Sequence, residues 1–571
     1  MKLVQIEIRH FRGIECCCWR PSEGANCLIG PGDSTKTTIL DAIELVLNPR
    51  QNQLLEDADF FDCDVGKPIE IIATLTGLPS EFVSEDRYGL HLRGWDADKK
   101  ALVDEPDSKL IDALSVRCMV GGDLEPRWSL YNNRIKQSSE DPPSLRYKDA
   151  RLAASVRLGP YADRHLAWGR QSALSRLSSS SESASSQLAA ATRAAREAFK
   201  GQPNPPFAGT VAVVAALSKK FAVPVRAMYR AALDSQVSMG AGGISLHDGD
   251  LPLRVLGTGS SRLLVAAIQH GSGSTSPIAL IDELEHGLEP HRIARLVKFL
   301  REPGEDGALA QSFFTSHSPV AIREMRAADV FCVRSEGGMT EVRSAEVTAS
   351  DANTAQRHLR ANPDAFLARR VIVCEGETEQ GMLRALDEIW AKTTDSFALQ
   401  GVIAVSGGGS SAPAFACHLA TLKHPVLLFL DGDRPLASVI QAELKELGVQ
   451  CEVWPGNLAL EPRMFLDLPW DAVKELIFNV ANRSSAESVR DSINARCKKM
   501  AIPELADLAL PTSLDSTGLR EAIGITAHEK DWFKSVSLGE ELGRNIEQHL
   551  AKMSATPFAT GIANVRAWAN G

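Results

Sequence analysis

Val371-Ile-Val-Cys-Glu-Gly-Glu-Thr-Glu379 is the stretch that decides the fold of the C-terminal half of the chain. It opens with a short apolar run, which is typical of a buried strand in a parallel sheet, and it ends in carboxylates beside a glycine. Leu427-Leu-Phe-Leu-Asp-Gly-Asp433 repeats this pattern further along. Because the carboxyl ends of parallel strands face the binding crevice of an open α/β sheet, we expect these carboxylates to converge there.

The acids that end these two runs form a candidate metal site. Crowded carboxylates repel one another unless cations lie between them, and Mg²⁺ or Mn²⁺ prefers such oxygen ligands. The expected catalytic and metal-binding residues are Glu375, Glu379, Asp431 and Asp433. For either motif alone a structural interpretation stays open, in which the glutamates complement a helix dipole and Asp431-Gly-Asp433 is an ordinary loop. Taken jointly, the arrangement resembles a TOPRIM domain, the metal-binding α/β module of topoisomerases, primases and certain nucleases.

A second motif lies near the start of the chain. Cys27-Leu-Ile-Gly-Pro-Gly-Asp-Ser-Thr-Lys-Thr-Thr38 predicts a strand, a glycine-rich turn and a helix start, the context of a phosphate-binding loop. Lys36 would reach the β- and γ-phosphates of a nucleotide, and the Thr37 hydroxyl would bind Mg²⁺. Thr35 stands where the motif normally has its second glycine, so we expect reduced nucleotide affinity or turnover. The expected nucleotide-binding residues are Gly30, Gly32, Asp33, Ser34, Lys36, Thr37 and Thr38.

The motifs that would complete a nucleotide site lie far downstream. Ile278-Ala-Leu-Ile-Asp-Glu283 predicts a buried strand with carboxylates at its tip. Asp282 would hold the Mg²⁺, and Glu283 would polarise the attacking water. Phe313-Phe-Thr-Ser-His317 predicts a strand that ends at a histidine placed to sense the γ-phosphate, although a lone histidine is more often structural.

These motifs together resemble the ATP-binding-cassette (ABC) ATPases of the SMC, Rad50 and RecF type. By that resemblance, Leu256 to Arg262 is the signature segment, with Gly259 at the nucleotide of the other subunit, and Glu285 to Pro290 is the D-loop. The signature is degenerate, because Gly257-Thr258-Gly259 stands where family members often carry Ser-Gly-Gly, and a clear Q-loop cannot be located. The resemblance implies two heads that sandwich ATP, and therefore a homodimer or higher oligomer.

Composition narrows the class of protein. The chain has 571 residues, of which 44% are hydrophobic and 23% are charged, which is typical of a globular protein. No apolar run is long enough for a signal peptide or a membrane span, so we expect a cytoplasmic protein without membrane contact. The eleven cysteines lack a Cys-x-x-Cys pair, which indicates reduced thiols without zinc. The net charge of −10 argues against indiscriminate binding of polyanions.

The expected fold class is α/β, with an ABC-type P-loop ATPase followed by a TOPRIM domain around a parallel sheet. A serine-rich stretch and an alanine- and arginine-rich helical pattern predict a helical insert within the ATPase, which would mediate dimerisation. The expected segments are 1–160 and 233–350 for the two ATPase parts, 161–232 for the insert, 351–370 for a connector and 371–571 for the TOPRIM nuclease domain.

An ATPase of this type followed by a TOPRIM domain resembles the OLD (overcoming lysogenisation defect) nucleases, including the nuclease subunit of Gabija-type anti-phage systems. The resemblance implies an ATP-binding endonuclease with two Mg²⁺ or Mn²⁺ ions at the TOPRIM site and one with ATP. DNA is the implied substrate, RNA is not excluded, and a helicase or other defence-system protein is an implied partner. Family members add a later acid and a lysine, which Glu461 and Lys534 match here, with Lys530 as the close competitor for the lysine.

Other classes of protein share parts of this pattern. A topoisomerase would need a tyrosine nucleophile, but the last tyrosine, Tyr229, lies far from the acidic motifs. A primase would need zinc, which these cysteines do not provide. The alternative that stays open is an ATPase clamp or sensor of the RecF/SMC type that binds DNA and regulates a partner effector. It predicts lost metal ligands, and none of the four acids is missing.

Overall fold

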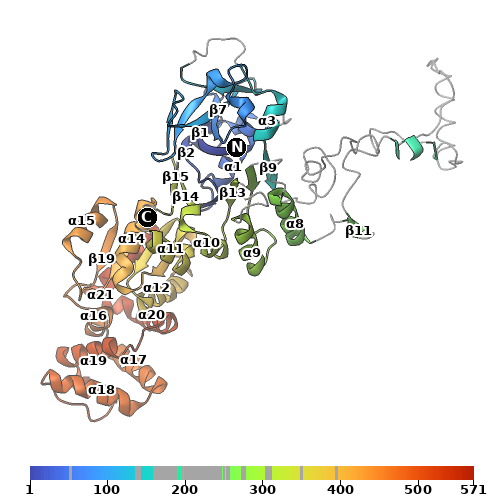
Figure 1. Cartoon of the computed structure of the whole chain (residues 1–571). Helices are drawn as coiled ribbons and strands as arrows, with labels where there is room; N and C mark the ends of the chain where they lie inside the picture. Colours follow the sequence, from blue (N-terminus) through green and yellow to red (C-terminus); the bar gives the residue numbers. More distant parts are fainter. Residues whose placement is uncertain are drawn as a thin grey trace, which may run out of the picture. The chain divides into compact units, whose positions relative to one another are not determined.

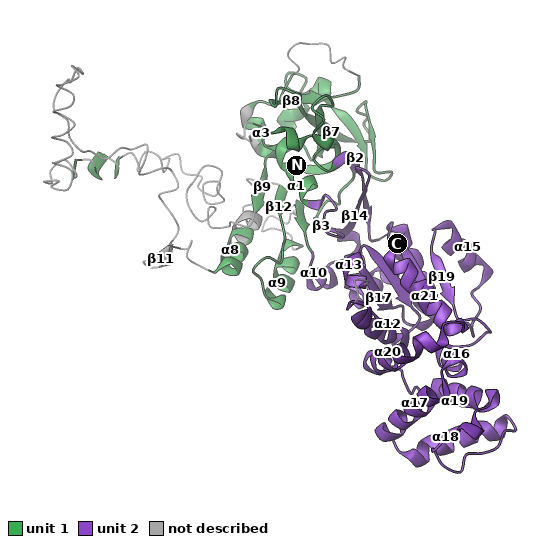
Figure 2. Cartoon of the chain, turned by 180° about the vertical axis from the view of Figure 1, so that it is seen from behind, with its two compact units in different colours: residues 1–13, 19–26, 37–316 green, residues 14–18, 27–36, 317–571 purple. Residues whose placement is uncertain are grey.

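The computed structural model describes residues 1–49, 55–134, 143–158, 257–271, 278–301, 311–346, 352–392 and 396–571, with short pieces between 190 and 252. The expected insert over 161–232 lies outside the described residues except for a few of these pieces. The chain forms two compact units, each made of several segments (Figure 2). Unit 1 comprises Met1–Gly13, Trp19–Asn26 and Thr37–Ser316; unit 2 comprises Ile14–Cys18, Cys27–Lys36 and His317–Gly571.

Unit 1 contains an antiparallel and a parallel set of strands (Figure 1). The antiparallel set pairs in the order β6 (Ala101–Val103), β5 (Arg93–Asp96), β7 (Ile111–Val120), β4 (Ile69–Thr76) and β1 (Lys2–Phe11), with β8 (Pro126–Tyr131) also paired to β7. In the parallel set, β12 (Ile278–Ile281) lies between β13 (Gln311–Thr315) and β9 (Ser155–Leu158). β10 (His247–Asp248) and β11 (Leu251–Pro252) pair antiparallel.

The principal helices of unit 1 follow its functional motifs. They are α1 (Lys36–Leu47), α8 (Thr258–Gly271) and α9 (Pro290–Leu300), with α2 (Ser80–Val83) and α3 (Tyr147–Ala153) as shorter elements. α9 starts at a proline, which suits the first helical position because the missing N–H would have no partner there. Among the described residues, no helix combines the length and apolar character that crossing a bilayer requires.

Unit 2 begins with four strands that are distant in sequence. β14 (Val330–Glu336) pairs in parallel with β3 (Ala25–Ile29) and antiparallel with β15 (Met339–Ser344), which in turn pairs with β2 (Ile14–Trp19). All five residues of β3 are buried, so the strand that leads into the phosphate-binding loop is held firmly by its surroundings. α10 (Pro319–Glu324) and α11 (Ala352–Ala361) lead to the second sheet.

The second sheet of unit 2 is parallel throughout, as the sequence predicted. Its order is β17 (Val402–Ser406), β16 (Arg370–Cys374), β18 (Val426–Leu430) and β19 (Gln450–Val453). The central strands are almost wholly buried, which explains their continuous apolar runs. The helices between these strands are α12 (Glu377–Trp390), α13 (Phe397–Gln400), α14 (Ala412–Thr421) and α15 (Ser438–Glu446).

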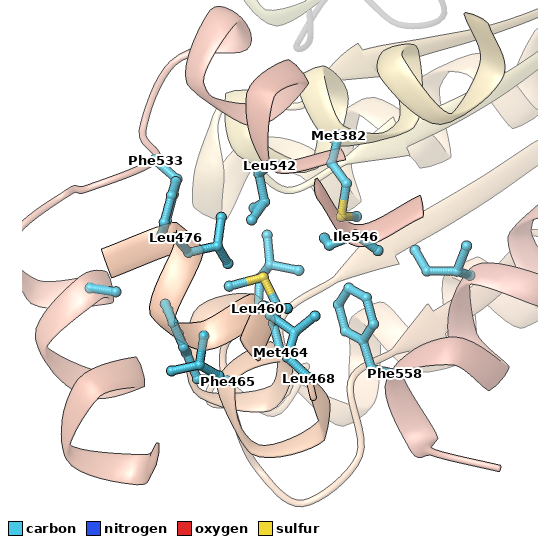
Figure 3. Close-up of a cluster of buried hydrophobic side chains, with 14 of the residues drawn as sticks. Met382, Leu460, Met464, Phe465, Leu468, Leu476, Phe533, Leu542, Ile546 and Phe558 are labelled. Atoms are coloured by element: carbon cyan, nitrogen blue, oxygen red, sulfur yellow. The ribbon is translucent and has the colours of Figure 1, made fainter. Parts of the chain in front are cut away.

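The C-terminal helices build one hydrophobic core with this sheet. They are α16 (Leu460–Asp467), α17 (Trp470–Arg483), α18 (Ala486–Lys499), α19 (Thr517–Glu529), α20 (Val536–Leu550) and α21 (Pro557–Asn570). The side chains of Met464, Phe465, Leu542, Ile546 and Phe558 meet in this core (Figure 3). Burying each such side chain stabilises the fold by about 1.5–3 kcal/mol, so the C-terminal helices fix the position of the sheet edge they cover.

Glycines allow α12 to pack closely against α20. A Cβ at Gly381 would overlap the carbonyl oxygen of Val536, and a Cβ at Gly539 would overlap that of Thr378. A Cβ at Gly543 would lie 2.6 Å from the carbonyl oxygen of Met382. The backbones of the two helices are therefore in direct contact, and the first turn of α12 is fixed by this packing.

We expect the Gly381→Ala substitution to destabilise the protein by about 1–3 kcal/mol, because the new methyl group forces α12 away from α20. The matched control is Gly518→Ala in α19, whose added Cβ would meet Ile502 at an ordinary 3.5 Å. Thermal unfolding followed by circular dichroism should show a lower midpoint for Gly381→Ala only. Equal midpoints for the two variants would contradict the close packing.

Candidate metal-binding and nucleotide-binding sites

The register of β16 against β18 brings two of the expected acids together. Cys374 lies opposite Phe429, and the Glu375 amide donates to the Phe429 carbonyl oxygen at 2.9 Å. The chain then turns, and the Asp431 amide donates to the Glu375 carboxylate oxygen Oε2 at 3.0 Å. The Glu375 carboxylate is thus held by the backbone of Asp431, the second acid of the site.

Two further acids join them from the first turns of helices. Glu379, only 4% exposed, accepts a hydrogen bond from the Gly376 amide at 3.0 Å at the start of α12. The Leu460 amide, at the start of α16, donates to Asp431 Oδ1 at 2.8 Å, which places the buried Glu461 next to the same group. We call Glu375, Glu379, Asp431 and Glu461 the acidic edge.

The acids of the acidic edge influence one another electrostatically. Burial, and then the carboxylates of Glu379, Glu375 and Glu461, raise the pKa of Asp431. Burial, followed by the charges of Glu461 and Glu375, also raises the pKa of Glu379. Among the described residues, Glu375, Glu379 and Asp431 form no ion pair. Their mutual repulsion is therefore not offset by a basic side chain.

The loop after β17 forms hydrogen bonds with the backbone of Cys374 and Glu375. The Gly407 amide donates to the Cys374 carbonyl oxygen at 2.7 Å, and the Gly409 amide donates to the Glu375 carbonyl oxygen at 2.8 Å. These two amides are committed to the backbone of the acidic edge. The glycine-rich loop therefore positions an acid in this structure.

A glycine is also required between the two aspartates of the second motif. A Cβ at Gly432 would overlap the carbonyl oxygen of Trp454, and the Gly432 amide donates to the Leu458 carbonyl oxygen at 2.8 Å. Asp433 lies beyond this turn and is exposed, with the Arg434 guanidinium 3.9 Å away. Asp433 therefore lies at the surface, whereas Asp431 is partly buried among the other acids.

The two candidate lysines lie at the surface. Lys534 is 70% exposed, and its ammonium pairs with Asp531 at 2.9 Å, which raises the lysine pKa. Glu461 adds a weaker attraction to Lys534. Lys530 lines a polar surface groove with Ser488 and Lys499 of α18. Lys534 therefore interacts electrostatically with Glu461 of the acidic edge.

His528 is a neighbour of the acidic edge that the sequence analysis missed. Its Nδ1 lies 3.0 Å from Glu461 Oε2, and this hydrogen bond is the main reason why the His528 pKa is raised. The charge of Asp433 raises it further. A histidine at the end of a helix gives no sequence signal, because the contact depends on how α16 packs against α19.

In the phosphate-binding loop, Lys36 is turned back onto its own backbone. Its ammonium donates to the carbonyl oxygens of Gly30 and Pro31 at 3.1 and 2.7 Å, and to Ser34 Oγ at 3.0 Å. A Cβ at Gly30 would lie 2.5 Å from the Val333 carbonyl oxygen, so glycine is required there. These contacts hold the lysine over the turn in which a phosphate would sit.

Thr35 adopts the left-handed backbone that a glycine would normally supply. Its φ is +63°, and that of Asp33 is +59°. For a residue with a side chain this conformation costs about 1–2 kcal/mol. The Thr35 hydroxyl donates to the Ser34 carbonyl oxygen at 2.7 Å, which ties the side chain to the loop. The loop thus keeps the glycine-like conformation despite the threonine.

The other expected nucleotide-binding residues of this segment differ in exposure. Gly32 and Asp33 are exposed on this loop, and Thr38 is half-buried at the start of α1.

Asp282 lies at the centre of a polar cluster in unit 1. Its Oδ1 accepts hydrogen bonds from the hydroxyls of Thr37 at 3.2 Å and Thr315 at 2.7 Å. Its Oδ2 accepts from the Arg157 guanidinium at 3.0 Å. The structure thus joins Thr37 and Asp282, the two residues expected to hold the nucleotide's Mg²⁺.

The remaining nucleotide-site residues are placed less closely. Glu283 is strained at φ +47° with its side chain 58% exposed and 3.5 Å from His286, and His317 is exposed beyond β13. Gly259, at the start of α8, packs directly on Gly287, where a Cβ would overlap the carbonyl oxygen. The signature segment and the D-loop segment therefore contact each other within unit 1.

The acidic edge fits a divalent cation by its chemistry. Its donors are carboxylate oxygens, its pKa values are raised by burial and repulsion, and a cation would relieve both effects. The second oxygens of Glu375 and Asp431 accept no hydrogen bond from the described residues. In that described part, however, no three acidic, histidine or cysteine side chains form a closed cage for a metal ion.

Comparisons with known proteins agree with this division of sites. Residues 124–323 match the family described as "AAA domain, putative AbiEii toxin, Type IV TA system". Residues 366–433 match the "Overcoming lysogenization defect protein-like, TOPRIM domain". The second match includes β16 and β18 and the four acids Glu375, Glu379, Asp431 and Asp433. No curated protein matches the chain.

Solved SMC head domains are similar to part of the chain. A head bound to the C-winged helix domain of ScpA has 15% identity and a TM-score of 0.34, covering 60% of this chain and 97% of that one. The head from Thermotoga maritima has 14% identity and a TM-score of 0.29, covering 60% and 99%. A head with an extended coiled coil, bound to the C-terminal domain of ScpA from Pyrococcus furiosus, has 14% identity and a TM-score of 0.34, covering 63% and 99%.

The chain thus joins an ATPase domain to a TOPRIM nuclease domain, and it is an ATP-binding TOPRIM nuclease enzyme. The expected α/β fold class is confirmed, and domains of these two kinds use a nucleotide and divalent metal. This combination of domains fits an OLD-family ATPase–TOPRIM nuclease, the family that the sequence resembles.

We expect Mg²⁺ or Mn²⁺, without nucleotide, to raise the thermal unfolding midpoint of the wild-type protein, because the cation offsets repulsion in the folded state only. Asp431→Asn removes a ligand and one of the repelling charges, so it should lose at least half of this shift. Glu377→Gln, an exposed acid in the same turn of α12 as Glu379, is the control and should keep it. A full shift in Asp431→Asn would contradict a metal site at the acidic edge.

Proposed function

We propose that the chain is a metal-dependent endonuclease that cuts DNA, with RNA as a further substrate to be tested. The observation that supports this most is the acidic edge, where Glu375, Glu379 and Asp431 lie together without a basic partner in the described part of the chain and only Glu461 pairs with a histidine, His528. Such an arrangement is costly unless a ligand requires it. In the proposal Glu375, Glu379, Asp431, Asp433 and Glu461 hold two Mg²⁺ or Mn²⁺ ions.

Bound there, the ions would activate a water and stabilise the departing oxygen of the phosphodiester. The chain's own residues supply the orientation. The amides of Asp431, Leu460 and Gly376 fix one oxygen each of Glu375, Asp431 and Glu379, so the other oxygens are presented in set directions. Lys534 steadies negative charge on the phosphate, and for this it must leave Asp531, which is exposed and 2.9 Å away.

In the same proposal, nucleotide state controls access to the nuclease site. Thr37 and Asp282 hold one Mg²⁺ with ATP, Lys36 binds its β- and γ-phosphates, and Glu283 polarises water for hydrolysis. Gly259 and His317 complete the site, with the signature segment acting across a homodimer or larger assembly. By the family resemblance, the biological role is anti-phage defence together with a helicase or other defence-system protein.

A clamp or sensor that binds DNA and regulates a partner effector is the second candidate. One observation favours it: within the described residues, the acids do not form a closed metal cage. On this alternative, a partner or nucleic acid must first draw the acids together, or the TOPRIM domain has no cutting activity of its own.

Cleavage of supercoiled plasmid with Mg²⁺ or Mn²⁺ distinguishes the two candidates. We expect metal-dependent nicking that Glu375→Ala and Asp431→Ala each lower by about 100-fold or more, because each removes a metal ligand. Glu377→Gln should cut like the wild type. Lack of cutting by the wild type with every metal, with and without ATP, would support the sensor instead.

Lys36→Ala tests the control by nucleotide. Removal of the phosphate-binding ammonium should weaken ATP binding by about tenfold or more and abolish any difference between cleavage rates with and without ATP. The wild type should show such a difference. If wild type and Lys36→Ala cut at the same rate in both conditions, nucleotide does not control the nuclease.

A further inference from the structure

The carboxylate of Asp282 is already paired with a cationic side chain. Arg157, at the carboxyl end of β9, donates from Nη2 to Asp282 Oδ2 at 3.0 Å. β9 and β12 pair in parallel, with Leu158 opposite Ile281. Arg157 and Asp282 therefore lie at the same end of adjacent strands. The expected Mg²⁺ ligand is thus held by an arginine as well as by the hydroxyls of Thr37 and Thr315.

Arg157 is also paired with the helix that follows the phosphate-binding loop. Its Nη1 contacts Asp41 and lies 3.2 Å from Glu44 Oε2, and both acids are on α1. The Arg157 side chain is 13% exposed, so these charges interact with little screening by water. One guanidinium therefore bridges three carboxylates that belong to the two elements of the nucleotide site.

A second arginine shares one of these acids but does not touch Asp282. Arg12 contacts Asp41 and donates from Nε to Asp59 Oδ1 at 2.8 Å. Asp41 therefore lies between two guanidinium groups. Arg12 is therefore a suitable control for Arg157, because it has the same charge and also pairs with Asp41 but does not contact Asp282.

A guanidinium and a magnesium ion compete for the same carboxylate. Both are cations, and two positive charges a few ångströms apart repel strongly where water is scarce. If Asp282 holds the nucleotide's Mg²⁺, as in the proposed function on which this inference rests, the Arg157 contact opposes the ion. Asp41 and Glu44 can retain the guanidinium when it leaves Asp282, so its charge stays compensated.

We propose that Arg157 is a positioning residue that holds Asp282 before nucleotide binds and releases it when the Mg²⁺–nucleotide complex enters. The release shifts the guanidinium onto Asp41 and Glu44 of α1. Arg157 thereby sets the Mg²⁺ concentration at which nucleotide binds, and it acts through Asp282 without contacting the phosphates.

The test measures binding of a fluorescent ATP analogue to the full chain while Mg²⁺ is varied, so no catalytic activity is needed. Arg157→Ala frees Asp282 and should lower the Mg²⁺ concentration for half-maximal binding by about fivefold or more, in line with the strength of hydrogen-bonded charge pairs. Arg12→Ala, the matched control, should stay within about twofold of the wild type, since its partners lie outside the metal ligand set. Arg157→Lys should fall between wild type and Arg157→Ala.

The Mg²⁺ requirement of the Arg157 and Arg12 variants distinguishes a specific role of Arg157 from a general effect of charge. An unchanged or higher Mg²⁺ requirement in Arg157→Ala would overturn the proposal, and so would equal shifts in Arg157→Ala and Arg12→Ala, which would indicate a general effect of charge. If Arg157→Ala does not fold, Arg157→Gln serves in its place, since it keeps a polar side chain against the acids. The variants Lys36→Ala and Asp282→Asn test the proposed nucleotide site separately from Arg157. If the wild type binds nucleotide without Mg²⁺, or if Lys36→Ala binds it as well as the wild type does, the nucleotide site itself is overturned.

Discussion

The hydrogen bond from the Asp431 amide to the Glu375 carboxylate is the interaction on which the acidic edge depends. It exists because β16 and β18 pair in a register that sets Cys374 opposite Phe429. A shift of one residue would turn the acids to the other face of the sheet. Once this bond is set, the Leu460 amide reaches Asp431, and α16 brings Glu461 to the same place. Burial of apolar side chains in the core (Figure 3) offsets the free-energy cost of this repulsion, since α16, the helix that carries Glu461, also carries Met464 and Phe465.

The nucleotide-binding segments contain three residues with a strained backbone. Asp33, Thr35 and Glu283 all have positive φ although none is glycine. Such conformations persist only where surrounding contacts over-determine them. For Thr35 that contact is its own hydroxyl on the Ser34 carbonyl oxygen, and for Glu283 it is the bond from its amide to the Thr315 hydroxyl at 2.8 Å. The same Thr315 hydroxyl donates to Asp282, so the strained turn and the candidate metal ligand are held by one group.

The sequence was sufficient to predict the strands that carry the acids, because a continuous apolar run that ends in carboxylates is a local pattern. It was not sufficient for His528, whose partner Glu461 is 67 residues away, or for Arg157, whose contacts come from α1 and β12. Both depend on how helices and strands pack, which no short pattern records. The choice between Lys534 and Lys530 also needed the structure, since the sequence does not distinguish the two lysines, and the structure shows an electrostatic attraction between Lys534 and Glu461.

The two acidic centres of the chain are balanced by opposite means. Asp282 receives a guanidinium and two hydroxyls, so its charge is compensated before any metal arrives. Glu375, Glu379 and Asp431 receive only backbone amides, and within the described residues they have no cationic partner. A metal ion at the acidic edge would remove repulsion, whereas one at Asp282 would have to displace an existing ion pair. In the proposed function, the repulsion among the acids favours binding of a metal ion at the acidic edge, while binding at Asp282 needs the additional negative charge of the nucleotide phosphates. This difference would make the nucleotide the ligand that controls the enzyme.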